Sequence, residues 1–327
     1  MVIQRLVATA CGLLLSAIGC FLFWVWHEYT SSKNDRPQIR LVVEPGATVN
    51  QVASQLVTLG VLESSWIFRL GARFDDLTLK IKSGEFLLNA GLSTREILHH
   101  FAFGKTVQRS LMVPEGLTKW EVAELVNSSL GLKGTIDARN LSEGNLFPDT
   151  YFYSWGDTRS KLIERMRTKM DGLITKTWAA RNKASVLRSP KELVTLASII
   201  EKEARLPSEL NKISAVFNNR LKLGMRLQAD PTVIYALTEG TRKLKRGLSR
   251  ADLRLRSPYN TYLVVGLPPG PIANPGEVSL RAAAQPANTD DLYFVADGKG
   301  GHLFARTLDQ HNLNVAKWRL LKRENYR

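Results

Sequence analysis

The pattern of apolar and polar residues divides the chain into an apolar run, a polar connection and a long stretch of mixed composition. Residues 6–26 carry no charge, and at about 1.5 Å per residue they are long enough for one transmembrane helix. The run ends in "WVWHEYTSS", without the Ala-x-Ala site of a cleaved signal peptide. We therefore predict a short N-terminal segment over 1–5, an uncleaved anchor over 6–26 and a polar linker over 27–40; the charges that flank the anchor do not decide its orientation. A cleaved leader and a lipoprotein site at Cys20 are the alternatives.

A glycine turn followed by an amphipathic helix occurs three times in the next part of the chain. The turns lie at 46–48, 91–93 and 116–118, and apolar residues follow each of them at helical spacing. Each turn ends in Ser or Thr, and Glu or Gln follows three residues later, as in a capping box. Short apolar segments such as "IRLVVE" and "RSLMVPE" precede two of the turns. The pattern predicts a small α+β module over 41–135, built from strand-turn-helix units. We interpret the repeat as a small carbohydrate-binding module. The alternative is that it reflects only favourable helix capping.

The remainder, 136–327, has the pattern of a mixed α+β domain. Apolar residues at helical spacing predict four helices, and one apolar run predicts a strand over 291–297. Proline and glycine are frequent after Gly224, so loops are expected there, including over 228–237. The predicted helices cover residues 160–183, 193–204, 213–225 and 276–286.

Two glutamates, Glu201 and Glu203, lie at the end of the helix predicted over 193–204. At helical rotation they lie about 80° on either side of the centre of the apolar stripe, so both are at its boundary. A carboxyl that is partly shielded from water has a raised pKa and can act as a general acid in glycosidic cleavage. A solvated helix end is the alternative reading. The geometry does not distinguish the two residues.

A cluster of amide, hydroxyl and aromatic side chains follows within about 35 residues, in segments rich in Pro and Gly. Amides and hydroxyls bind sugar oxygens, and aromatic faces pack against sugar rings, so the cluster predicts a cleft opposite the glutamates. Turn formation and core packing are the alternative for each residue alone. The cluster comprises Gln228, Asp230, Thr232, Tyr235, Tyr259, Asn260 and Tyr262.

Composition narrows the class of ligand. A formal charge of +15 and a pI near 9.9 favour an anionic partner. No nucleic-acid-binding motif accompanies the basic runs, and the histidines lack metal-ligand spacing, so we expect no nucleic acid, no metal and no cofactor. Both cysteines lie in 6–26, which excludes disulfides and thiolate metal sites from residue 28 onward.

Several motifs, in order, resemble the endolytic murein transglycosylase family, also called MltG or YceG-like proteins. They are "LASIIEKEA", "VFNNRLKLGMRLQADPTVIYAL", "PYNTY", "GLPPGPIANPG" and "LYFVADGKGGHLF". The resemblance implies a short cytoplasmic N-terminus over 1–5, a single-pass anchor in the inner membrane, a LysM-like module over 41–135 and a periplasmic catalytic domain over 136–327. It also implies contact with membrane lipid and with peptidoglycan synthases (penicillin-binding proteins).

The resemblance further implies a lytic transglycosylase that cleaves the bond between N-acetylmuramic acid and N-acetylglucosamine inside nascent glycan strands. Such cleavage leaves 1,6-anhydro ends without water and would limit strand length. Related enzymes use the Glu of a Glu-Ser pair at a helix end; Glu203 matches best, with Ala204 in place of Ser, and Glu201 is the second choice. The expected substrate-binding residues are Gln228, Asp230, Thr232, Tyr235, Asn260 and Tyr262. The alternatives are a muramidase with Asp230 as second carboxylate and a non-catalytic peptidoglycan binder.

Overall fold

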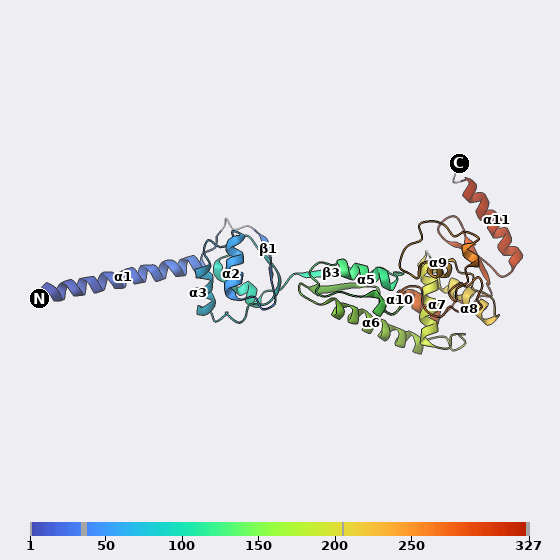
Figure 1. Cartoon of the computed structure of the whole chain (residues 1–327), viewed down its shortest axis with the longest axis horizontal. Helices are drawn as coiled ribbons and strands as arrows, with labels where there is room; N and C mark the ends of the chain where they lie inside the picture. The colour runs from blue at the N-terminus through green and yellow to red at the C-terminus, as the bar shows by residue number, and fades with distance from the viewer. Residues whose placement is uncertain (1, 34–37, 205, 325–327) are drawn as a thin grey trace. The chain divides into compact units, whose positions relative to one another are not determined.

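The computed structural model describes residues 2–33, 38–204 and 206–324, and its packing divides the chain into two compact units (Figure 1). Unit 1 comprises Met1–Arg109, Leu130–Lys133 and Phe152–Asp157. Unit 2 comprises Ser110–Ser129, Gly134–Tyr151 and Thr158–Arg327. Both contain helices and strands, which confirms the predicted α+β composition.

Unit 1 begins with one long apolar helix and continues as a small module of two strands and three helices. The strands β1 and β2 pair antiparallel, with Ile39 opposite Leu88 and Val43 opposite Gly84. Phe68, Phe86 and Phe101 are fully buried at the centre of the module. The elements are α1 (Val2–Thr30), β1 (Ile39–Val43), α2 (Val49–Thr58), α3 (Ser65–Phe74), β2 (Gly84–Leu88) and α4 (Thr94–Phe103).

The predicted strand-turn-helix repeat is confirmed in all three copies. Gly46, Gly91 and Gly116 have φ of 82°, 78° and 74°, a region that glycine adopts without the steric penalty of a Cβ. The helix after each glycine begins with a complete capping box. The first two copies, β1 with α2 and β2 with α4, form the core of unit 1. The third copy consists of β3 (Gln108–Met112) and α5 (Lys119–Ser128).

The apolar run predicted as an anchor over 6–26 is the middle of α1, which continues to Thr30. Among the described residues, α1 is the helix that is long and apolar enough to cross a membrane. The predicted linker over 27–40 therefore begins inside a helix and ends inside β1, while its residues 34–37 lie outside the described residues. Helix α3 was not predicted from the sequence.

Unit 2 is built around α7, which contacts α6, α8, α9 and α10. All eight residues from Leu193 to Ile200 are buried, so the helix is surrounded on every side. Two strand pairs accompany the helices: β3 pairs with β4, which follows it after α5, and β5 forms an antiparallel hairpin with β6. The remaining elements are β4 (Thr150–Ser154), α6 (Arg159–Ala179), α7 (Pro190–Glu203), α8 (Leu210–Lys222), α9 (Asp230–Thr238), α10 (Glu277–Ala284), β5 (Tyr293–Ala296), β6 (His302–Ala305) and α11 (Leu308–Glu324).

The four helices predicted in this part of the chain are confirmed as α6, α7, α8 and α10, and the predicted strand is confirmed as β5. The prediction of a loop over 228–237 is wrong, because α9 occupies most of it. Pro231 lies in the first turn of α9, where proline needs no helical hydrogen bond from its nitrogen. Strand β6 and helix α11 were not predicted.

Asn274 ties the third strand-turn-helix copy to the rest of unit 2. It is buried; its side-chain Nδ2 donates to Leu117 O at 2.9 Å, and its Oδ1 accepts the Leu146 N–H at 2.9 Å. Its backbone O accepts the Gly116 N–H at 2.9 Å. The main division of the chain therefore falls at 109/110, whereas the sequence placed the boundary between module and catalytic domain at 135/136.

We predict that Asn274→Ala lowers the free energy of unfolding of unit 2 by about 2 kcal/mol, because it leaves the Leu146 N–H buried without a partner. The measurement is urea unfolding of the full chain in detergent. Asn312→Ala, at an exposed position on α11, is the matched control and should change stability by less than about 0.5 kcal/mol. Equal effects of the two substitutions would contradict the role given to Asn274.

Candidate active site

Helix α7 presents its last residue, Glu203, at the edge of the core of unit 2. The helix begins at a Ser189 cap, whose hydroxyl accepts the Glu192 N–H, and Pro190 occupies its first turn. Ala204 leaves the helix with extended backbone, φ −75° and ψ 135°. Because the residues from Leu193 to Ile200 are buried in the core, the backbone from which the Glu203 side chain extends is held in place.

The Glu203 carboxyl lies in a mostly dry position beside the N-terminus of α9. Burial, and after it the negative charge of Asp230, raises the pKa of Glu203 from its ordinary 4.5 to about 7. The Arg220 guanidinium and a hydrogen bond from the Asp230 backbone N–H oppose this shift. A substantial fraction of Glu203 is therefore protonated near neutral pH and able to donate a proton.

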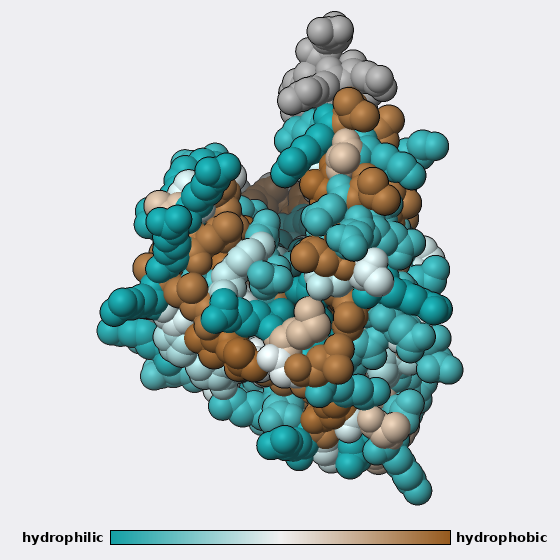
Figure 2. Space-filling view, turned by 90° about the vertical axis from the view of Figure 1, so that its right-hand side faces the viewer, coloured by the Kyte–Doolittle hydropathy of each residue, from teal (hydrophilic) through white to brown (hydrophobic). Residues whose placement is uncertain are grey.

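Glu203 faces a cleft of about 830 Å³ within unit 2. One wall is formed by the ends of α7 and α9, the other by the β5–β6 hairpin, its glycine-rich turn and α11. In the space-filling view, the face that carries α11 is mostly polar, with apolar residues along the helix (Figure 2). The lining residues are Lys202, Glu203, Asp230, Pro231, Ile234, Phe294, Val295, Ala296, Gly298, Gly300, Gly301, His302, Trp318 and Lys322.

Glu201 does not line this cleft. Its Oε2 accepts the Gly276 N–H at 3.0 Å, at the N-terminal cap of α10. Glu115 lies next to it, and burial together with the charge of Glu201 raises the pKa of Glu115. Glu201 therefore fastens the end of α7 to α10, and the structure gives the two glutamates different surroundings.

Asp230 and Tyr262 meet at the cleft beside Glu203. The Tyr262 hydroxyl donates to Asp230 Oδ1 at 2.6 Å, and Asp230 itself is exposed. Tyr262 comes from a loop that lies 32 positions further along the chain. Both residues belong to the cluster predicted from the sequence, and the structure brings them together with Glu203.

Arg220 is a buried cation near this group that sequence reasoning missed. Its Nε donates to Leu292 O at 2.7 Å, and its Nη1 donates to Leu227 O at 2.6 Å. Burial lowers the pKa of Arg220, while the nearby Tyr293, Tyr262 and Glu203 work against that. Hydrophobic periodicity gives no sign that an arginine of α8 points inward.

Thr232 and Asn260 have no exposed surface with which to contact a sugar. The Thr232 hydroxyl bonds to Ala229 O and to the Thr261 hydroxyl at 2.7 and 2.8 Å. The Asn260 amide donates to Leu253 O and Leu255 O and shapes the loop that leads to Tyr262. The sequence predicted that both residues bind substrate. In the structure they instead hold the backbone next to the site in place.

Gln228 and Tyr235 both lie outside the lining of the cleft, in different surroundings. Gln228 is exposed, with φ of 52°, two residues before Asp230. Tyr235 faces away from the cleft lining: its hydroxyl donates to Glu143 Oε2 at 3.3 Å, and its ring lies 4.9 Å from that of Tyr259. Burial raises the pKa of Glu143 to about 7, so a second shielded carboxyl exists outside the cleft.

His302 forms the far side of the cleft and was also missed. Its Nδ1 lies 2.7 Å from Glu209 Oε2, and its backbone N–H donates to Glu209 Oε1 at 2.9 Å. These bonds hold the start of β6 to the segment that follows α7. Metal-ligand spacing is the histidine signal that the sequence can show, and a single histidine paired with a distant carboxylate does not produce it.

The chain matches the model of the YceG-like family over residues 41–317, and it belongs to that family. It is 31% identical over 339 residues to a Bacillus subtilis protein named endolytic murein transglycosylase, with 94% of this chain and 92% of that protein aligned. A Streptococcus pneumoniae protein of the same name is 28% identical over 87% of this chain and 59% of its own length.

A solved structure is also similar. The crystal structure of a YceG-like protein from Listeria monocytogenes has a TM-score of 0.51 and 31% sequence identity, covering 85% of this chain and 99% of that one. The similarity therefore extends through both units and is not limited to the motifs around α7.

We predict that Glu203→Gln becomes progressively more stable than the parent as the pH rises from about 4.5 to above about 7. A carboxyl with a raised pKa in the folded state stabilises the fold fully below its unfolded pKa, and that contribution is lost as pH rises through the folded pKa. Glutamine does not ionise. The measurement is the thermal midpoint of each full chain in detergent against pH.

Glu164→Gln, at an exposed position of α6, controls for the loss of one negative charge. A difference between Glu203→Gln and the parent that is independent of pH over this range would contradict the shielded position assigned to Glu203.

Proposed function

We propose that this protein is a membrane-anchored endolytic lytic transglycosylase that cleaves the bond between N-acetylmuramic acid and N-acetylglucosamine within peptidoglycan strands. The observation that carries the proposal is Glu203, a shielded carboxyl with a pKa of about 7 that lines a cleft of about 830 Å³. Membership of the YceG-like family and the names of the relatives support it.

Glu203 would serve as acid and then as base. Its proton passes to the glycosidic oxygen as the bond to C1 of the muramic sugar breaks, and positive charge develops on that sugar. The resulting Glu203 carboxylate then accepts the proton of the C6 hydroxyl as O6 bonds to C1. The proton returns to Glu203, no water is consumed, and the product carries a 1,6-anhydro end.

The charges around Glu203 fit both steps. Asp230 raises the pKa of Glu203 in the free site, which favours the acid form. The same negative charge would stabilise the positive charge that develops on the sugar. The bond from Tyr262 holds the Asp230 carboxylate in place. Because Glu203 acts as both acid and base and the C6 hydroxyl is the nucleophile, the reaction needs no second carboxylate.

The walls of the cleft provide the contacts that a glycan chain needs. Asp230, which accepts the Tyr262 hydroxyl, supplies a polar group on one side, and Trp318 supplies an aromatic face on the other. Lys202 and Lys322 line the same cleft and would attract the carboxylates of peptide stems. Glu201 acts as a positioning residue through its bond to Gly276.

The proposal extends to the arrangement at the membrane. Helix α1 would anchor the chain in the inner membrane, with the rest of unit 1 and the whole of unit 2 in the periplasm. The module of unit 1 would act as a LysM-like binder of glycan strands, and peptidoglycan synthases would be partners at the site of strand growth. The repeated strand-turn-helix architecture and the match to the family over 41–317 support this part.

We predict that Glu203→Gln lowers the rate of strand cleavage by about 100-fold or more, because it removes the acid and base. Glu201→Gln is the matched control: it should retain most of the activity and lose mainly stability, since it weakens the bond to Gly276. The measurement is mass spectrometry of products from uncrosslinked glycan strands.

The same spectra test the alternatives. Products with a reducing end, heavier by one water, would indicate a muramidase that uses Asp230 as its second carboxylate. Strands that are bound but not cut would indicate a binding protein. A Glu203→Gln chain with full activity would contradict the assignment of Glu203.

A further inference from the structure

Helix α3 of unit 1 lies against the C-terminal end of α1, as Figure 1 shows. The Trp66 ring stacks on Phe21, with centroids 6.5 Å apart, and lies 6.1 Å from Trp24. At the other end of α3, the Phe74 ring meets Trp26 edge-on at 6.0 Å. The aromatic side chains of α3 are therefore continuous with those of the last part of the predicted anchor.

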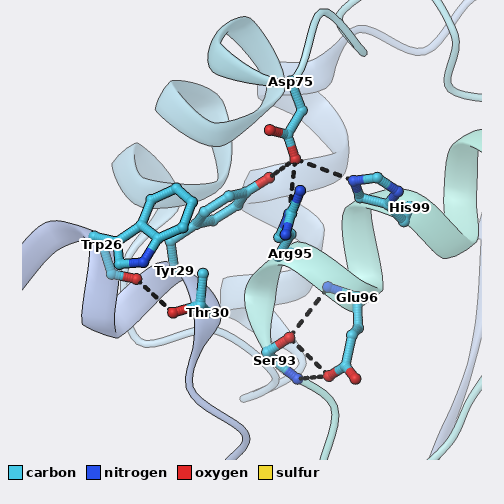
Figure 3. Close-up of polar contacts among 8 residues, drawn as sticks. All are labelled: Trp26, Tyr29, Thr30, Asp75, Ser93, Arg95, Glu96 and His99. Carbon is cyan, nitrogen blue, oxygen red and sulfur yellow. Dashed lines mark hydrogen bonds and ion pairs between the residues drawn. The ribbon is translucent and has the colours of Figure 1, made fainter.

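The contact is fixed by a buried tyrosine of α1. The Tyr29 hydroxyl donates to Asp75 Oδ2 at 2.7 Å, and the same oxygen lies 3.2 Å from Arg95 Nε and 3.0 Å from His99 Nε2 (Figure 3). Tyr29 packs on Gly71, where an added Cβ would overlap its ring. These contacts fix the position of α3 along the axis of α1.

Part of α3 and the segment after it is apolar and exposed. Leu70 is 47% exposed, Phe74 73% and Leu79 97%. Trp66, Leu70 and Phe74 recur every four residues and so share one face of the helix. Large apolar side chains that form a continuous exposed face mark an interaction surface.

The contacts of this face with α1 indicate how deep it would lie in a membrane that α1 spans. Phe21 lies five residues before Trp26, where the predicted span ends, which corresponds to about 8 Å along the helix. Interfacial helices bury their apolar face about 5–10 Å into the boundary between headgroups and acyl chains. A hollow of about 340 Å³ between α1 and α3 opens on the same side, with an almost wholly apolar lining that includes Leu22, Val25 and Leu70.

Basic residues lie next to the apolar face. Arg69 and Arg73 are exposed on α3, one turn apart. Both line a wider hollow of about 770 Å³, together with Leu70 and Leu79. Arginine beside tryptophan, leucine and phenylalanine is the composition of a helix that rests on a phospholipid surface, because guanidinium groups bind phosphate.

We propose that α3 is a second membrane-contacting element, with Trp66, Leu70 and Phe74 inserted among lipid acyl chains and with Arg69 and Arg73 at the phosphates. The module of unit 1 then rests on the membrane surface. This inference depends on the proposed anchoring by α1. It adds an element outside the transmembrane helix that contacts lipid directly.

The test is the depth of single spin labels on the full chain in phospholipid nanodiscs, measured by collision with oxygen and with a water-soluble nickel complex. Labels are placed at Leu70→Cys and Phe74→Cys after both native cysteines are changed to serine. Lys105→Cys, exposed in the loop after α4, is the aqueous control. Native Cys11, with Cys20→Ser, reports on the anchor itself.

Labels at Leu70 and Phe74 are expected to show a several-fold higher ratio of oxygen to nickel collisions than the label at Lys105. A ratio equal to that at Lys105 would overturn the proposal, and low collision rates with both reagents would overturn it in favour of a protein contact. A water-exposed label at Cys11 would instead show that α1 does not span the membrane, so the two failures are distinguishable. Thermal unfolding of each labelled chain checks that its fold is retained.

Discussion

The burial of α7 on all sides is the constraint on which the candidate site depends. A helix surrounded by α6, α8, α9 and α10 has no freedom to rotate or slide, so its last turn presents each side chain to a different neighbour. Glu201 meets the cap of α10, and Glu203 meets the N-terminus of α9. Two glutamates separated by one residue thus acquire different surroundings from packing alone.

Electrostatics then determine what Glu203 can do. Its carboxyl has lost much of its water and lies near one like charge, Asp230, and one buried opposite charge, Arg220. The two charges act on its pKa in opposite directions, and desolvation prevails. The same arrangement allows one carboxyl to give up a proton and take it back near neutral pH. A transglycosylation that consumes no water requires that cycle.

The sequence predicted those parts of the fold that local patterns determine. Capping boxes and apolar spacing located the three repeated units and α7, because helix ends and buried faces leave regular signals. The inward positions of Arg220, Thr232 and Asn260 depend on which loops pack together, which no local pattern reveals. Helix α9 was mistaken for a loop because Asp230 and Pro231 are typical of turns as well as of helix starts. Of the predicted cluster, Asp230 and Tyr262 meet at Glu203, whereas Tyr235 faces Glu143.

The most direct test of this account is the titration of the Glu203 carboxyl itself. Infrared difference spectra between the full chain and Glu203→Gln isolate the carbonyl stretch of its protonated form, which can be followed with pH. The account predicts that half of this band is lost near pH 7. A band that has vanished by about pH 5, as for an ordinary glutamate in water, would contradict it.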